Sequence, residues 1–133
     1  MARLMRTVAV ESPLKGDFVR NRRYALWCGY DCYRRGEAPL ILHIHYPQFL
    51  NDLDPEHREF GITAGYAWTH HADLHAFYQD IGISDGMWRR HRHFDAHDPR
   101  VVFRNLPEDL MQAFERGEYP RSTLGFVTVV VSP

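Results

Sequence analysis

Short apolar runs alternate with longer amphipathic stretches along this chain of 133 residues. Short runs that are rich in β-branched or aromatic residues and end at Pro, Gly or Asp are typical of buried strands. We therefore expect five strands, over residues 6–11, 39–45, 74–78, 100–104 and 126–131. The second run is continuously apolar up to its histidines, which favours a strand buried on both faces.

The stretches between these runs carry the spacing of amphipathic helices. In the first stretch, steps of seven, three and four residues place four side chains on one helical face: Phe18, Ala25, Cys28 and Cys32. Gly36 is suited to end that helix, because glycine adopts the left-handed conformation common just after a helix. We expect helices over residues 17–35, 54–71, 84–96 and 107–117.

The helix expected over residues 54–71 has the clearest start. Asp54 is a good N-cap, and the proline after it is favoured at the first helical position. Small residues along this helix allow a neighbour to approach closely: Gly61, Ala64, Gly65 and Ala67. We interpret them as packing positions rather than as part of a chemical site.

The alternation of strands and helices predicts the architecture. Parallel strands need long connections, so strands separated by helices indicate a mostly parallel five-stranded sheet with right-handed crossovers and helices on both faces. The length fits one α/β domain over residues 1–133. In such sheets, ligands bind beyond the carboxyl ends of the strands.

Composition and charge narrow the class of protein. A formal net charge of -1 gives no overall positive field to hold nucleic acid, so a nucleic-acid partner is disfavoured despite the basic residues 89–93. No apolar run approaches the roughly 18 residues of a membrane span. Cys28 and Cys32 lie one helical turn apart, where a disulfide would be strained. Reduced thiols and a cytoplasmic location are therefore expected.

Polar residues and glycines follow the first three predicted strands, where a ligand would lie. The binding candidates are Ser12, Lys15 and Gly16 after the first strand, His43, His45 and Tyr46 at the second, and Ser84, Gly86 and Met87 after the third. Ser84 at a helix start could help to hold a phosphate or carboxylate, or it could only cap the helix. Neither a GxGxxG nor a GxxxxGKS signature is present, so no nucleotide cofactor is expected.

The histidines and the serines give weaker evidence for a metal site or a catalytic nucleophile. His43 and His45 would point the same way only if the strand includes both, and the chain has no HExxH or CxxC motif. We therefore expect no bound metal. The absence of a GxSxG motif also disfavours a serine nucleophile.

Carboxylates are the more natural catalytic candidates. Glu11 and Asp80 each end a predicted parallel strand, where either could serve as a general base or as a nucleophile on the anomeric carbon of a sugar. Their alternative roles are structural. Asp80 could hold the following loop, and Glu11 could pair with Lys15 or Arg20.

Four motifs in order carry a family resemblance. They are VAVESPLKGD at 8–17, RGEAP at 35–39, DPEHREFGI at 54–62 and GISDGM at 82–87. Over about residues 6–107 the chain resembles small phage and bacterial domains that are similar to nucleoside 2-deoxyribosyltransferases and nucleotide N-hydrolases. The resemblance implies a three-layer flavodoxin-like fold and a homodimer or higher homo-oligomer. It also implies a nucleoside or nucleotide ligand in a bacterial cell, with a phage-encoded origin as one source.

The same resemblance implies roles for individual residues. Ser12 and Gly16 would lie near the sugar and base, and Ser84 and Gly86 would hold a 5′-phosphate. The active enzymes carry a glutamate nucleophile six positions after the motif serine, where this chain has Arg90. Arginine cannot act as that nucleophile, although its planar fork suits a phosphate.

Two functions follow from these observations. The first is an enzyme that acts on the bond between base and deoxyribose, with Asp80 or Glu11 as the carboxylate. The second is a protein that senses or sequesters nucleotides and has lost the catalytic glutamate.

Overall fold

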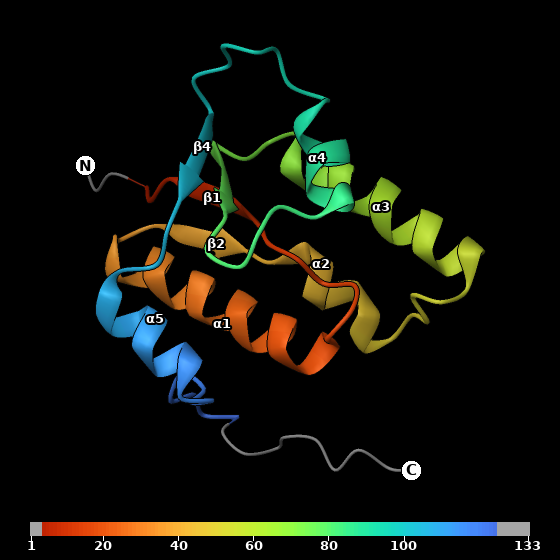
Figure 1. Cartoon of the computed structure of the whole chain (residues 1–133). Coiled ribbons are helices and arrows are strands. Elements are labelled where there is room, and N and C mark those ends of the chain that lie inside the picture. Colours follow the sequence, from red (N-terminus) through yellow and green to blue (C-terminus); the bar gives the residue numbers. More distant parts are fainter. Residues whose placement is uncertain (1–3, 125–133) are drawn as a thin grey trace.

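The strands of the computed structural model, which describes residues 4–124, form one all-parallel sheet (Figure 1). Its order is β2-β1-β3-β4, with bounds β1 Thr7–Glu11, β2 Ala38–Leu40, β3 Leu74–Tyr78 and β4 Val101–Arg104. The predicted α/β class and parallel sheet are confirmed. The described part of the chain has four strands rather than five, and the fifth predicted strand, at 126–131, lies outside the described residues.

Helices connect these strands in the expected alternation. Their bounds are α1 Phe18–Arg34, α2 Leu42–His45, the 3-10 helix η1 Tyr46–Gln48, α3 Pro55–Thr69, α4 Asp85–His91 and α5 Glu108–Glu115. Asp54 caps α3 as predicted, because its carboxylate accepts hydrogen bonds from the backbone N–H groups of Glu56 and His57. The fourth helix ends at His91 rather than near residue 96.

The main apolar core lies between the sheet and the helices α1 and α5 (Figure 1). Alternate side chains of β1 and β3 point into it, as the two-residue period of a strand requires. Its buried members include Val8, Val10, Leu74, Ala76, Tyr78, Tyr24, Cys28, Cys32, Leu110 and Phe114. The predicted buried face of α1 is confirmed at Ala25 and both cysteines, which are free thiols, whereas Phe18 at the start of the helix is exposed.

Helix α4 lies at the other face of the sheet (Figure 1). The remaining side chains of β3 point to that face, because successive side chains of a strand alternate. The Phe77 ring lies 5.5 Å from the ring of His91 at the end of α4. His75 is buried against Phe94, with 4.3 Å between ring centroids.

The second predicted strand is wrong in length and in burial. Only Ala38–Leu40 is a strand, it is half-buried, and the chain turns into α2 at Leu42. The physical reason is that β2 is an edge strand and pairs with β1 alone. Pro39 has no N–H for a second neighbour, which is why proline in a sheet is confined to edges.

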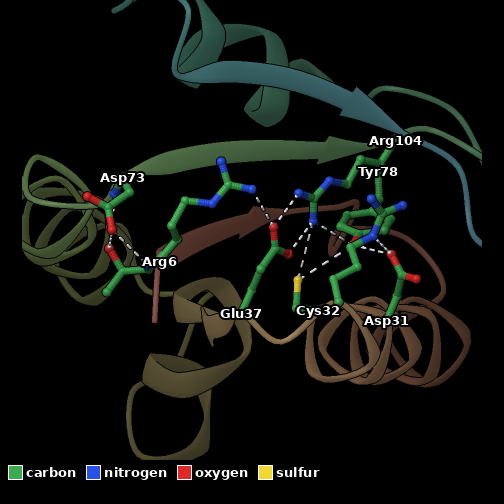
Figure 2. Close-up of polar contacts among 9 residues, drawn as sticks. Arg6, Asp31, Cys32, Glu37, Asp73, Tyr78 and Arg104 are labelled. Atoms are coloured by element: carbon green, nitrogen blue, oxygen red, sulfur yellow. Dashed lines mark hydrogen bonds and ion pairs between the residues drawn. The ribbon is translucent and has the colours of Figure 1, made fainter. Parts of the chain in front are cut away.

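A buried polar network ties the strands to the end of α1 (Figure 2). Arg104 donates two hydrogen bonds of 2.8 Å to the carboxylate of Glu37, just before β2. It also donates to the hydroxyl of Tyr78, which in turn donates to Asp31 of α1 at 2.6 Å. Three regions that are far apart in sequence, around residues 31–37, Tyr78 and Arg104, are therefore joined by hydrogen bonds. Those that involve a charged group are stronger than neutral ones.

Candidate functional site

A cavity of about 430 Å³ opens where β1 ends, between the loop after β1, α2, α3 and the start of α4. Small-molecule sites typically have volumes of this size. It lies beyond the carboxyl ends of the strands, as the parallel sheet predicts. The candidates that line it are Glu11, Ser12, Lys15, Gly16, His43, Tyr46, Ser84, Gly86, Met87 and Arg90.

Two sequence candidates lie outside this cavity. The carboxylate of Asp80 accepts hydrogen bonds from the Tyr24 hydroxyl at 2.5 Å and from the backbone N–H of Leu106 at 2.9 Å. Asp80 thus holds the loops after β3 and β4 onto α1. His45 is exposed, contacts the ring of Phe49, and borders a separate hollow beside β2.

The pairing of Glu11 with Arg90 dominates the cavity floor. Arg90 Nε lies 3.2 Å from Glu11 Oε1, and both side chains are largely buried. Burial raises the pKa of Glu11 to about 7, although the charge of Arg90 acts to lower it. Glu11 therefore exchanges a proton near neutral pH, as a general base or acid requires. The ion-pair partner of Glu11 is therefore Arg90, and not Lys15 or Arg20 as the sequence suggested.

Helix α3 holds the Arg90 side chain in place. The guanidinium lies 4.3 Å from the centroid of the Tyr66 ring, a cation–π contact. A Cβ atom on Gly65 would lie 3.1 Å from Arg90 Nη2, so the glycine leaves room for the guanidinium. Arg90 Nη1 is buried and has no hydrogen-bond partner among the described residues. The floor thus presents a cationic donor whose bonding capacity is not fully used.

A second polar pair, Ser12 and His43, lies on the same floor. Ser12 Oγ and His43 Nε2 are 2.7 Å apart, and Ser12 is only 4 % exposed. Burial, followed by the charge of Arg90, lowers the pKa of His43 to about 4. His43 is therefore neutral at physiological pH and hydrogen-bonds Ser12 without carrying charge.

The start of α4 forms one wall of the cavity. The Ser84 hydroxyl accepts a hydrogen bond from the backbone N–H of Met87, and Met87 Sδ accepts one from the backbone N–H of Ser84. This is the capping arrangement that the sequence left as one of two alternatives for Ser84.

Charged side chains of both signs surround the cavity. Arg58 is paired with Asp52 at 2.9 Å, whereas Lys15 and Arg89 form no ion pair with the residues that the structure describes. These two cations provide positive charge beside the cavity. They are the cations of the cavity lining that an anionic group of a ligand could pair with.

The sequence did not predict that α3 lines the cavity, because the rule for parallel sheets points to the loops after strands and not to helices. Several α3 residues line the cavity: Arg58, Gly61, Ile62, Gly65 and Tyr66. The two glycines, four residues apart on one helical face, were the available signal. Gly65 does let α3 approach a neighbouring helix, α4, but the group it faces is the guanidinium of Arg90, which also lines the cavity.

Within residues 4–124, no three His, Cys, Asp or Glu side chains gather in a way that could hold a metal ion. None of the helices described there has the length and apolar character that crossing a bilayer needs.

The fold and the cavity define a parallel α/β domain with a polar site at the carboxyl ends of its strands. The chain belongs to the family described as Domain of unknown function (DUF7768), whose model matches residues 6–104. That match spans β1 to β4 and every segment that lines the cavity. Searches of curated proteins and of solved structures found no match.

Proposed function

We propose that this domain binds a deoxynucleoside 5′-monophosphate or deoxynucleoside and cleaves the bond between base and deoxyribose, with Glu11 as the catalytic carboxylate. The observation that carries the proposal is a buried carboxylate on the cavity floor whose pKa is about 7. The motif resemblance to nucleoside 2-deoxyribosyltransferases and nucleotide N-hydrolases supports the choice of substrate.

The finer fold assignment belongs to the same proposal. A three-layer flavodoxin-like architecture agrees with the order β2-β1-β3-β4, because that class has the strand order 2-1-3-4-5 and binds its ligand beside strands one and three. The cavity after β1, walled by the start of α4, has the corresponding place in this sheet.

The chemistry is a substitution at C1′ of the sugar. A water oxygen forms a bond to C1′ while the bond from C1′ to the base nitrogen breaks, and that nitrogen keeps the electron pair and takes up a proton from solvent. Glu11 accepts the proton that the water loses and then releases it to solvent. Arg90 positions the carboxylate, and its charge keeps part of the Glu11 population ionised at neutral pH.

Release of free base tests the enzymatic function. The purified chain is incubated with the four common deoxynucleosides and their 5′-monophosphates, and free base is followed by chromatography. We expect Glu11→Gln to lower the release rate by about 100-fold or more, the usual range for a general base. The control Glu115→Gln changes an exposed carboxylate of α5 and leaves the rate unchanged. Equal rates in both variants would exclude Glu11 as the catalytic group.

A second function, nucleotide binding without cleavage, is favoured by one observation. Arg90 pairs directly with Glu11, and such a cation lowers the nucleophilicity of a carboxylate. Calorimetry distinguishes the two functions. Binding without release of base supports a sensing or sequestering protein, and release of base supports the enzyme. If no nucleoside or nucleotide binds more tightly than millimolar, both the enzymatic and the binding function are overturned.

A further inference from the structure

The Ser12–His43 pair has no part in the bond cleavage proposed above, yet it lies on the same cavity floor. Glu11 and Ser12 are neighbours at the end of β1, and His43 comes from α2, which β1 contacts. The 2.7 Å contact between Ser12 and His43 crosses 31 residues of sequence. Ser12 is buried and His43 is half-buried, and a hydrogen bond formed over such a separation fixes the Ser12 hydroxyl relative to Glu11.

The hydrogen-bonding capacity of this pair exceeds what the protein uses. A serine hydroxyl has one donor and two acceptor sites, and a neutral imidazole has one donor and one acceptor. A single bond to His43 leaves Ser12 at least one further site, whichever atom donates. The buried Nη1 of Arg90 adds an unused donor on this floor. Buried polar groups normally find partners, so this floor suits a polar ligand group.

The charge of the floor selects the kind of group. A phosphate placed here would meet the Glu11 carboxylate, so it is better accommodated beside Lys15 and Arg89 at the outer part of the cavity. A neutral hydroxyl has no such conflict. It can donate to Ser12 or accept from it, and it can also accept from Arg90 Nη1.

We propose that His43 is a positioning residue that fixes the Ser12 hydroxyl, and that Ser12 binds a sugar hydroxyl of the ligand. This inference rests on the proposed function for the identity of the ligand. A 2′-deoxynucleoside 5′-monophosphate carries one free sugar hydroxyl, at C3′. The pair thus recognises the 3′-hydroxyl and places C1′ of the same sugar beside Glu11.

Matched ligands test this recognition. Calorimetry compares the four 2′-deoxynucleoside 5′-monophosphates with the four 2′,3′-dideoxy counterparts, which lack only the 3′-hydroxyl. For the wild-type chain we expect the deoxy ligand to bind roughly five- to tenfold more tightly, the usual contribution of one hydrogen bond to an uncharged group. In Ser12→Ala and His43→Leu the preference falls severalfold, because Ser12→Ala removes the Ser12 hydroxyl and His43→Leu no longer holds it in place. Any preference that remains comes from Arg90 Nη1.

Two further variants separate positioning from a general structural role. His43→Gln carries an amide that can hydrogen-bond Ser12, so it retains most of the preference for the 3′-hydroxyl. His70→Leu changes an exposed histidine at the end of α3 and leaves the preference unchanged. A purely structural role would weaken both ligands of a pair equally and leave their ratio intact.

The outcomes separate this inference from the function on which it rests. Equal binding of deoxy and dideoxy ligands by the wild-type chain overturns the inference alone. The same holds if Ser12→Ala or His43→Leu binds ligands and keeps the full preference. Failure of the wild-type chain to bind any of the eight monophosphates overturns the proposed function and this inference together.

Discussion

Burial moves the pKa values of acidic and basic side chains in opposite directions in this domain. It raises the pKa of Glu11 to about 7 and lowers those of His43 and His75 to about 4, because it disfavours the charged form of each group. At neutral pH both histidines are uncharged, and Glu11 is the group of the three that titrates. Among these three buried groups, Glu11 is therefore the one whose charge changes near neutral pH.

The rate of base release should follow the ionisation of Glu11. Glu11 must be ionised to accept a proton, so the rate rises with pH through about 7 and is lost as pH falls below it. In Arg90→Gln the midpoint moves to higher pH, because the neighbouring cation that lowers the pKa is removed. Arg92→Gln, in which an exposed arginine is changed, keeps the wild-type midpoint. A pH-independent rate between 5 and 9, roughly two units either side of that pKa, would contradict this assignment.

Replacing His75 should stabilise the fold. Its ring is buried and packs against the tilted ring of Phe94, and neither nitrogen has a hydrogen-bond partner among residues 4–124. His75→Phe keeps a ring against Phe94 and removes two unsatisfied atoms, so we expect the free energy of unfolding at pH 7.5 to rise by about 1–2 kcal/mol. Urea unfolding followed by circular dichroism measures it.

The same variant should alter the pH dependence of stability. The folded-state pKa of His75, about 4, lies below the ordinary 6.5. The unfolded chain therefore binds the proton first on acidification, and stability is lost as pH falls from about 6.5 towards 4. His75→Phe removes this contribution. An equal loss of stability between pH 7.5 and pH 4.5 in both proteins would contradict the prediction.

At the scale of elements, α3 carries two glycines with different surroundings. A Cβ on Gly65 would meet Arg90 at 3.1 Å, whereas one on Gly61 would lie 3.7 Å from Tyr46, an ordinary contact. Both substitutions by alanine favour the helix by up to about 1 kcal/mol. We expect Gly61→Ala to gain stability without changing the pH midpoint of base release. Gly65→Ala displaces the guanidinium, so the midpoint rises as in Arg90→Gln; an unchanged midpoint would show that Arg90 adapts.

Elements whose residues mark both their type and their ends were predicted well from sequence. The strand predicted over 74–78 has the bounds of β3, and Asp54 followed by a proline predicted the start of α3. The run at 39–45 was wrongly predicted to be one strand, because a short apolar run fits a strand and a helical turn equally well. Pro39 was the neglected signal, since it marks an edge strand.

That error also changed the expected site. Residues two apart point the same way on a strand but about 200° apart on a helix, from 3.6 residues per turn. On α2, His43 therefore lines the cavity and His45 does not. The loops around Glu11 were found from topology alone. Arg90 was a binding candidate as well, but its pairing with Glu11 was not expected, because a contact across 79 residues leaves no local trace in the sequence.

At the scale of the whole molecule, removing one partner from the pair of Arg104 and Glu37 should cost far more than the same change in a surface pair, because it leaves a buried charge without a partner. The Arg104–Glu37 side chains are 8 % and 5 % exposed, whereas those of Arg34 and Asp109 are 41 % and 63 % exposed. Removing one partner of a buried pair typically costs about 3–5 kcal/mol, and an exposed pair contributes about 0–1 kcal/mol. We therefore expect Arg104→Met to destabilise the fold by at least about 3 kcal/mol and Arg34→Met by under about 1 kcal/mol. If urea unfolding shows that both variants lose a similar free energy of unfolding, the prediction is contradicted.

The two buried thiols of α1 give this molecule a built-in reporter. Cys28 and Cys32 lie wholly inside the core, and burial raises the pKa of both, so little reactive thiolate forms while the helix is packed. A thiol reagent can reach them only when α1 separates from the sheet. The rate of alkylation under native conditions therefore measures how often that layer opens, with no added label. Slower alkylation with a nucleotide present would show directly that ligand binding at the far end of β1 holds the layers together.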